Sequence, residues 1–207
     1  MAGTNWEVEV KFYLWNMASL EQRVKALPAT LCQPRTHERN LRFDTRDRNM
    51  SAAFRVLRLR KDTANWLTYK GPGWIVDGVR QREEIEFQIS DFDQARVLLE
   101  ALGYQVVLVY EKYRAVYEYN GTLIALDKTP LGDFVEIEGP DAASIKALSQ
   151  LLGLDWSSRI HKSYVELFEQ VRQNINAPVV HLTFDELAGI EVASSHLGVQ
   201  YADQPLP

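Results

Sequence analysis

Charged side chains occupy alternate positions in several short segments of this 207-residue chain. Glu7, Glu9 and Lys11 form the first such set, and the segments around Arg58 and Glu136 repeat the pattern. Every second side chain of an extended strand points to the same face, so each set shares one face of a strand. Carboxylates suit a hard divalent cation such as Mg²⁺ or Mn²⁺, whereas Arg and Lys suit phosphate oxygens. These residues therefore predict a site for a phosphate chain that is bound together with a metal ion.

The full set of such residues holds both signs of charge. The bases are Lys11, Arg58, Arg60, Lys70, Arg82, Lys112 and Arg114, and the acids are Glu7, Glu9, Glu84, Glu86, Asp127, Glu136 and Glu138. Like charges two residues apart on one strand face repel each other, yet such pairs recur among both the bases and the acids. Repeated like-charge pairs favour a ligand or a metal between them. An organic dicarboxylate would match the bases but would leave the acids without a purpose.

A simpler interpretation is an antiparallel sheet with one solvated face, on which charged residues need no function. It is the better explanation for any single strand, because charged side chains are mostly exposed in proteins. It weakens here because every predicted strand keeps a charged face, whereas ordinary exposed strands mix Ser, Thr, Gln and Lys.

Apolar residues fill the positions between these charges, as Val8 and Val10 do in the first segment. Asn120-Gly121, between two such segments, is a strong hairpin signal. Helical spacing and capping residues predict helices over residues 19–27, 90–102, 141–152 and 163–175, with a last short helix opening at Thr183. We therefore predict an α+β fold, in which an antiparallel sheet closes into a barrel with helices packed outside. The apolar strand faces then pack against the helices, and the charged faces point into the barrel.

The composition is that of an ordinary globular protein, with 46% hydrophobic residues and a formal net charge of −5. This acidic balance argues against a general nucleic-acid binder, which is usually basic. Cys32 is the single cysteine, so no intrachain disulfide can form and a reducing compartment is the simplest expectation. We see no signal peptide and no apolar run of about 20 residues, so we expect a cytoplasmic protein that does not bind membranes.

The motifs, taken in order, resemble those of the CYTH superfamily, also called triphosphate tunnel metalloenzymes. Glu7-Val8-Glu9-Val10-Lys11 matches its Glu-x-Glu-x-Lys signature. The supporting motifs are Leu57-Arg58-Leu59-Arg60, Leu67-Thr68-Tyr69-Lys70-Gly71-Pro72, Arg82-x-Glu84-x-Glu86, Glu111-Lys112-x-Arg114, Asp127 with Leu131-Gly132-x-Phe134, Glu136-Ile137-Glu138 and Lys162-Ser163-Tyr164. The resemblance covers about residues 5 to 170. It implies an eight-stranded antiparallel tunnel that binds triphosphates with Mg²⁺ or Mn²⁺.

The resemblance also assigns roles to individual positions. The implied metal ligands are Glu7, Glu9, Asp127, Glu136 and Glu138. The implied phosphate-binding residues are Lys11, Arg58, Arg60, Lys70, Arg114 and Lys162, with Arg82 and Lys112 as further candidates. The residues that we expect to carry catalysis are Glu7, Glu9, Lys11, Glu84 and Glu136, with Glu84 ordering a second metal or its water.

Two parts of the chain depart from the family pattern. Many members read Gln-x-Asp-x-Tyr-Phe-Asp where this chain has Glu38-Arg39-Asn40-Leu41-Arg42-Phe43-Asp44, so Arg42 replaces an aromatic residue and the role of this strand in substrate choice stays open. We expect residues 1–176 to form the tunnel domain. Residues 177–207 have no counterpart in the pattern, and we expect an extension with one short helix and a loose tail.

Three functions remain open at this stage. The leading one is a metal-dependent triphosphatase acting on inorganic triphosphate, thiamine triphosphate or a nucleoside triphosphate. The second is a class IV adenylate cyclase, which the resemblance equally permits but for which the sequence offers no evident pocket for adenine and ribose. The third is a non-catalytic binder of polyphosphate or nucleotide, which would have little use for five metal-type carboxylates. A small-molecule triphosphate is the expected partner in each case, and a homodimer is allowed.

Overall fold

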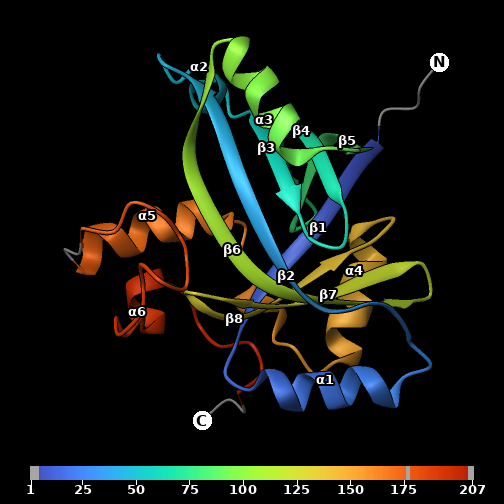
Figure 1. The fold of residues 1–207 in the computed structure, drawn as a ribbon. Coiled ribbons are helices and arrows are strands. Elements are labelled where there is room, and N and C mark those ends of the chain that lie inside the picture. The colour runs from blue at the N-terminus through green and yellow to red at the C-terminus, as the bar shows by residue number, and fades with distance from the viewer. Residues whose placement is uncertain (1–4, 176–177, 205–207) are drawn as a thin grey trace.

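The computed structural model describes residues 5–175 and 178–204. Within them, eight antiparallel strands close into a barrel in the order β1-β5-β4-β3-β2-β6-β7-β8, which confirms the fold predicted from the sequence (Figure 1). The strands are β1 (Asn5–Leu14), β2 (Thr30–Thr45), β3 (Val56–Lys61), β4 (Asn65–Val76), β5 (Val79–Ile89), β6 (Tyr104–Tyr119), β7 (Thr122–Thr129) and β8 (Gly132–Glu138). The helices are α1 (Met17–Ala26), α2 (Asn49–Ala52), α3 (Phe92–Ala101), α4 (Ala142–Leu151), α5 (Tyr164–Ile175) and α6 (Ser194–Leu197), with a 3₁₀ turn η1 (Trp156–Ser158).

Strand β1 closes the barrel by pairing with β5 along its first half and with β8 along its second half. Residues from Asn5 to Glu9 pair with β5, and those from Glu9 to Leu14 pair with β8. Glu9 therefore stands where β1 joins the two parts of the sheet. It lies directly opposite Glu138 of β8.

The main apolar core lies outside the barrel, between its wall and helices α1 and α4. Val10 and Phe12 of β1 are buried there against Leu20 of α1 and Ile145 of α4. Burying one such side chain contributes about 1.5–3 kcal/mol, so this layer fixes which face of β1 points outward. In Figure 1, α1 and α4 lie together below the barrel, α3 lies along its upper part, and α5 and α6 flank it at the left.

The four longer predicted helices are present, with small shifts at their ends. Helix α1 begins at Met17 because the side chain of Asn16 accepts a hydrogen bond from the Ser19 amide at 3.0 Å. Helix α3 is capped by Asp91 and begins at Phe92, two residues after the predicted start at residue 90. The Asp91 carboxylate accepts a hydrogen bond from the Gln94 amide at 2.9 Å, and its negative charge also interacts favourably with the helix dipole.

The carboxy-terminal segment differs from the expectation. A run of turns follows Thr183, and the short helix is α6, which begins at Ser194. Leu182, Leu187 and Leu197 of this segment are buried with α5 in a second apolar cluster.

The predicted loose tail is also anchored where the structure describes it. The Ala202 amide donates to the Tyr13 carbonyl at 2.9 Å, and the Asp203 carboxylate accepts from the Trp15 and Asn16 amides at 2.6 and 2.9 Å. The last residues, 205–207, lie outside the described part. No helix among the described residues is long and apolar enough to cross a membrane.

Candidate active site

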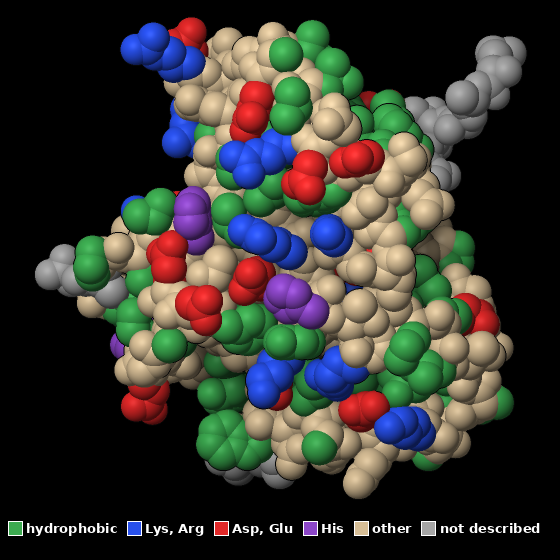
Figure 2. All heavy atoms as spheres, in the orientation of Figure 1, with side chains coloured by type: hydrophobic (Ala, Val, Ile, Leu, Met, Phe, Trp, Pro, Cys, Tyr) green, Lys and Arg blue, Asp and Glu red, His purple; other side chains and the backbone are tan. Residues whose placement is uncertain are grey.

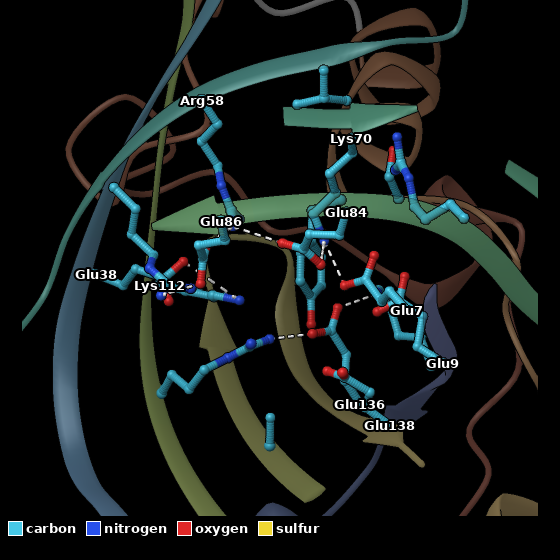
Figure 3. Close-up of a pocket in the computed structure, with 18 of the residues that line it drawn as sticks. Glu7, Glu9, Glu38, Arg58, Lys70, Glu84, Glu86, Lys112, Glu136 and Glu138 are labelled. Atoms are coloured by element: carbon cyan, nitrogen blue, oxygen red, sulfur yellow. Dashed lines mark hydrogen bonds and ion pairs between the residues drawn. The ribbon is translucent and has the colours of Figure 1, made fainter. Parts of the chain in front are cut away.

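The barrel encloses a cavity of about 820 Å³ lined by side chains from all of its strands. The charged strand faces point into this cavity, as the sequence predicted. On the outer face shown in Figure 2, acidic and basic side chains are interspersed over β2 and β6. Inside, Glu7, Glu9, Glu136 and Glu138 gather on one side of the cavity, and Lys112 extends from the opposite side, where it lies beside Glu38 (Figure 3).

Carboxylates of β1, β5 and β8 form an acidic wall, which we define as Glu7, Glu9, Glu84 and Glu138. Burial and the neighbouring Glu7 raise the pKa of Glu9 above its usual value. Removal from water, together with Glu7, Glu9 and Glu84, raises the pKa of Glu138 to about 7. Glu7 holds Lys70, its Oε1 lying 2.5 Å from the lysine Nζ, but its buried Oε2 has no hydrogen-bond partner within the described residues. The acidic wall therefore carries more negative charge than its neighbours neutralise.

This wall fits a hard divalent cation, because a metal ion would relieve the mutual repulsion and engage the free Glu7 oxygen. Glu7, Glu9 and Glu138 are the residues that would hold it. In the part of the chain that the structure describes, no three metal-type side chains are already drawn together into a finished ligand set. The carboxylates would therefore have to turn toward the ion as it binds.

Asp127 does not belong to the acidic wall. Its side chain is fully buried behind the cavity and accepts hydrogen bonds from Lys112 Nζ at 3.2 Å, Arg114 Nε at 2.6 Å and the Tyr164 hydroxyl at 2.7 Å. These donors occupy both of its oxygens. In this arrangement Asp127 holds Lys112 and Arg114 in place, and its role as a metal ligand stays a prediction.

Glu136 has a similar position between two bases, but it faces the cavity. One of its oxygens pairs with Lys11 and the other with Arg114. Burial alone would raise its pKa, but Lys11 and Arg114 outweigh burial and hold the pKa well below its usual value. Glu136 thus orients two cations, and both of its oxygens are occupied in this arrangement.

The opposite, basic wall is formed by Arg58 and Arg60 of β3 together with Lys112 and Arg114 of β6. Glu86 holds the first two, with its oxygens 3.2 Å from Arg58 Nη2 and 3.1 Å from Arg60 Nη2. Thr68 donates its hydroxyl hydrogen to the same carboxylate at 2.6 Å. Side chains that are locked in this way present guanidinium groups in fixed positions, which favours recognition of phosphate oxygens.

Tyr164 and Glu38 are site residues that the sequence did not single out. Tyr164 lies at the start of α5, with Lys11 Nζ 4.3 Å and Lys112 Nζ 5.3 Å from its ring centre. Glu38 is 1% exposed and lies 3.6 Å from Lys112. The motif Lys162-Ser163-Tyr164 contained the signal for Tyr164, whereas Glu38 lies in the strand that departs from the family pattern.

Lys162 and Arg82 differ from the other predicted phosphate ligands. Lys162 is exposed, lies outside the cavity and bonds the Gln170 side chain, so the structure separates it from the site. Arg82 lines the cavity but is 5% exposed and donates to the Gly71 carbonyl at 2.7 Å. Burial and the nearby Arg80 lower the pKa of Arg82, because both disfavour its charged form.

One end of the cavity is bordered by α2 and the turn after it, including Ser51 and Phe54. Asp44 at the end of β2 holds this segment by accepting from the Met50 and Ser51 amides at 2.9 and 3.0 Å. Phe54 is 78% exposed and has a φ of +55°, a left-handed conformation that bulky residues rarely adopt.

The family model of the CYTH domain matches residues 5–164. Adenylate cyclase CyaB of Aeromonas hydrophila is 27% identical over 175 residues, which cover 80% of this chain and 90% of that protein. A solved structure from Vibrio parahaemolyticus, described as a candidate adenylate cyclase, superposes with a TM-score of 0.73 at 24% identity, covering 81% of this chain and 99% of that one.

A Hippeastrum protein, described as a candidate adenylyl cyclase with a dominant triphosphatase activity, has a TM-score of 0.58 at 19% identity. The match covers 79% of this chain and 95% of that one. At such identities the two solved structures establish the shared fold alone. The family model covers most of the chain and agrees with the motifs and the closed barrel: this protein belongs to the CYTH domain family.

Proposed function

We propose that this protein is a metal-dependent triphosphatase that hydrolyses a small-molecule triphosphate inside the barrel. The observation that carries the proposal is one cavity in which a surplus of carboxylates faces cations that are held in fixed positions. The acidic wall has a surplus of carboxylates that fits a divalent cation, and the basic wall facing it has fixed guanidinium and ammonium groups. A triphosphate chelated to a metal satisfies both walls at once.

The chain's own residues would act chiefly by placement and charge. Arg58 and Arg60, fixed by Glu86, would bind phosphate oxygens on one side, and Lys112 and Arg114 would bind them on the other. When bound, a divalent cation would supply Lewis acidity toward the phosphate oxygens.

Glu84 is our candidate for orienting the attacking water. It lies on the acidic wall with Lys70 Nζ at 3.0 Å, so its carboxylate is held in position without being buried behind the cavity as Asp127 is. Such a site lowers the barrier by positioning the water and stabilising charge on the transferring phosphoryl group.

A second candidate is cyclisation of ATP, in which the ribose 3′-hydroxyl attacks the α-phosphate and pyrophosphate leaves. The similarity to adenylate cyclase CyaB, which extends over 90% of that protein, favours it. Val116, Leu123 and Ala125 also line part of the cavity and would offer an apolar surface to a nucleoside. Hydrolysis has the smaller requirement, since it needs no fixed base and ribose, and we place it first.

One experiment separates the candidates. The purified protein is incubated with inorganic triphosphate, ATP or thiamine triphosphate, each with Mg²⁺ or Mn²⁺, and the products are resolved by chromatography. Metal-dependent release of orthophosphate supports the triphosphatase, and cyclic AMP with pyrophosphate supports the cyclase. Tight binding without turnover would contradict both and indicate a binding protein. A parallel incubation in EDTA is the control for the metal.

A further inference from the structure

Arg42 of β2 faces the cavity and lies directly opposite Arg58 of β3. Its neighbours Leu41 and Phe43 are buried on the outer side of the sheet with Leu59, which turns Arg42 inward. In the pairing of β2 with β3, Arg42 and Arg58 are register partners. Like charges that lie directly opposite each other on neighbouring strands repel and destabilise the sheet.

Arg42 is also a cation without a partner. The other bases on the cavity wall are held: Lys11, Arg58, Arg60, Lys70, Lys112 and Arg114 each pair with a carboxylate. Arg80 pairs with Glu166, and Arg82 donates to a backbone carbonyl. Among residues 5–175 and 178–204, Arg42 has neither an ion pair nor a side-chain hydrogen bond.

The nearest acid along the same strand cannot compensate Arg42. The oxygens of Asp44 accept from the backbone amides of Thr45, Met50 and Ser51 at 2.8–3.0 Å, so this carboxylate is committed to holding α2. Tyr110, across from this part of β2, accepts from Arg58 at 3.3 Å and, within the described part of the chain, donates to no carboxylate. Arg42 therefore adds a positive charge that no carboxylate among the described residues neutralises, directly opposite Arg58, which Glu86 holds.

We propose that Arg42 is a specificity-determining residue, which clamps a terminal phosphate of the substrate together with Arg58. This inference rests on the proposed function and names the substrate class: inorganic triphosphate in preference to a nucleoside triphosphate. Both ends of inorganic triphosphate are free phosphates, so one of them reaches this pair in either orientation, whereas a nucleoside triphosphate that lies with its esterified end here presents less charge. Because Arg42 replaces the aromatic residue of the family pattern, this position offers charge and a bidentate donor in place of an apolar contact.

The test compares Arg42→Tyr with Arg39→Tyr. Arg39 lies on the same strand, but it is exposed on the outer face, so its replacement makes the same change of charge away from the cavity. Affinities for inorganic triphosphate and for ATP are measured by titration calorimetry in EDTA, where metal-dependent hydrolysis does not proceed. We expect Arg42→Tyr to weaken binding of inorganic triphosphate by about 10- to 100-fold, the scale of a charged hydrogen bond, and to change ATP binding by less than about threefold. Arg39→Tyr should leave both affinities unchanged.

Thermal unfolding gives an independent readout. Without ligand, Arg42→Tyr should unfold at the same or a higher temperature, because it removes a like-charge pair; with inorganic triphosphate it should gain less stability than the parent protein. Arg42→Gln, a smaller polar replacement, serves if the tyrosine variant does not fold. Equal loss of affinity for both ligands, or none for either, would overturn the proposal. Because these are binding measurements, a shift in selectivity would uphold it even if the product assay excluded hydrolysis, and an unchanged selectivity would refute it even if hydrolysis were found.

Discussion

The hydroxyl group of Tyr164, at the first turn of α5, donates a hydrogen bond of 2.7 Å to Asp127 Oδ2, behind the cavity. This bond ties a helix outside the barrel to the carboxylate that holds Lys112 and Arg114 inside it. The same tyrosine ring lies 4.3 Å from Lys11 Nζ. Through Tyr164, the packing of α5 on the barrel positions three cations of the site.

Replacing Asp127 should chiefly lower the free energy of unfolding. Asp127→Ala removes the buried carboxylate that Lys112 and Arg114 share, and we expect the free energy of unfolding to fall by about 3–5 kcal/mol. Denaturant unfolding followed by circular dichroism measures this change. Asp127→Asn, which keeps the shape and part of the hydrogen bonding, should lose less. If either variant kept full stability but lost its affinity for the metal, the result would instead support Asp127 as a direct metal ligand.

Glu138 should make the metal-free protein less stable as the pH rises. Its pKa of about 7 in the folded state lies above the value of 4.5 that an ordinary glutamate has, so the folded state binds more protons between these two values. Stability therefore falls from about pH 4.5 to about pH 7, and affinity for a divalent cation increases over the same range because the ligand must lose its proton. Urea unfolding in EDTA across this range should show a smaller decline for Glu138→Gln than for the parent protein. Identical pH profiles would contradict the assignment.

Glu38 should contribute in the opposite direction. Burial alone would raise its pKa, but Lys112 and Arg114 outweigh burial and lower the pKa to about 2. Its contribution, at most about 3 kcal/mol, is present above about pH 4.5 and is lost as the pH falls toward 2. We expect Glu38→Gln to be less stable than the parent protein at neutral pH and to approach it in acid. A constant difference at every pH would argue that Glu38 acts through packing alone.

Glu136 and Arg58 should separate turnover from binding. Glu136→Ala releases Lys11 and Arg114 together, and we expect kcat for metal-dependent turnover to fall by about 100-fold or more. Arg58→Ala removes one phosphate contact and should mainly raise KM. Steady-state kinetics with inorganic triphosphate distinguishes the two effects, and Lys61→Ala, at the exposed end of the same strand as Arg58, is the matched control. Full activity in Glu136→Ala would mean that this face of β8 has another role.

Alternation along the strands is a strong enough signal to predict the barrel and its charged interior. A period of two fixes which face a side chain occupies, so Glu7, Glu9, Arg58 and Glu136 were placed inward from sequence alone. The same alternation does not show whether an inward side chain reaches the cavity or is buried behind it. Asp127 alternates as the metal-type carboxylates do, yet it lies behind the cavity because three donors from β6 and α5 surround it.

Other differences arise where tertiary packing decides. Lys162 and Tyr164 are two residues apart at the entry to a helix, where no fixed alternation applies, and only Tyr164 reaches the cavity. The segment from 178 to 204 has no sustained periodicity, so its docking through Leu182 and Ala202 could not be predicted from local pattern.

Phe54 combines a left-handed backbone with an exposed aromatic ring, and neither feature stabilises the fold. A left-handed backbone at a bulky residue costs about 1–2 kcal/mol, and an aromatic ring left 78% exposed returns little of it through burial. Glycine would be the choice of a designer who wished only to make this turn easy to form. The natural sequence keeps phenylalanine in this strained turn at the rim of the cavity, so a thermostabilising redesign of the protein should leave residue 54 unchanged.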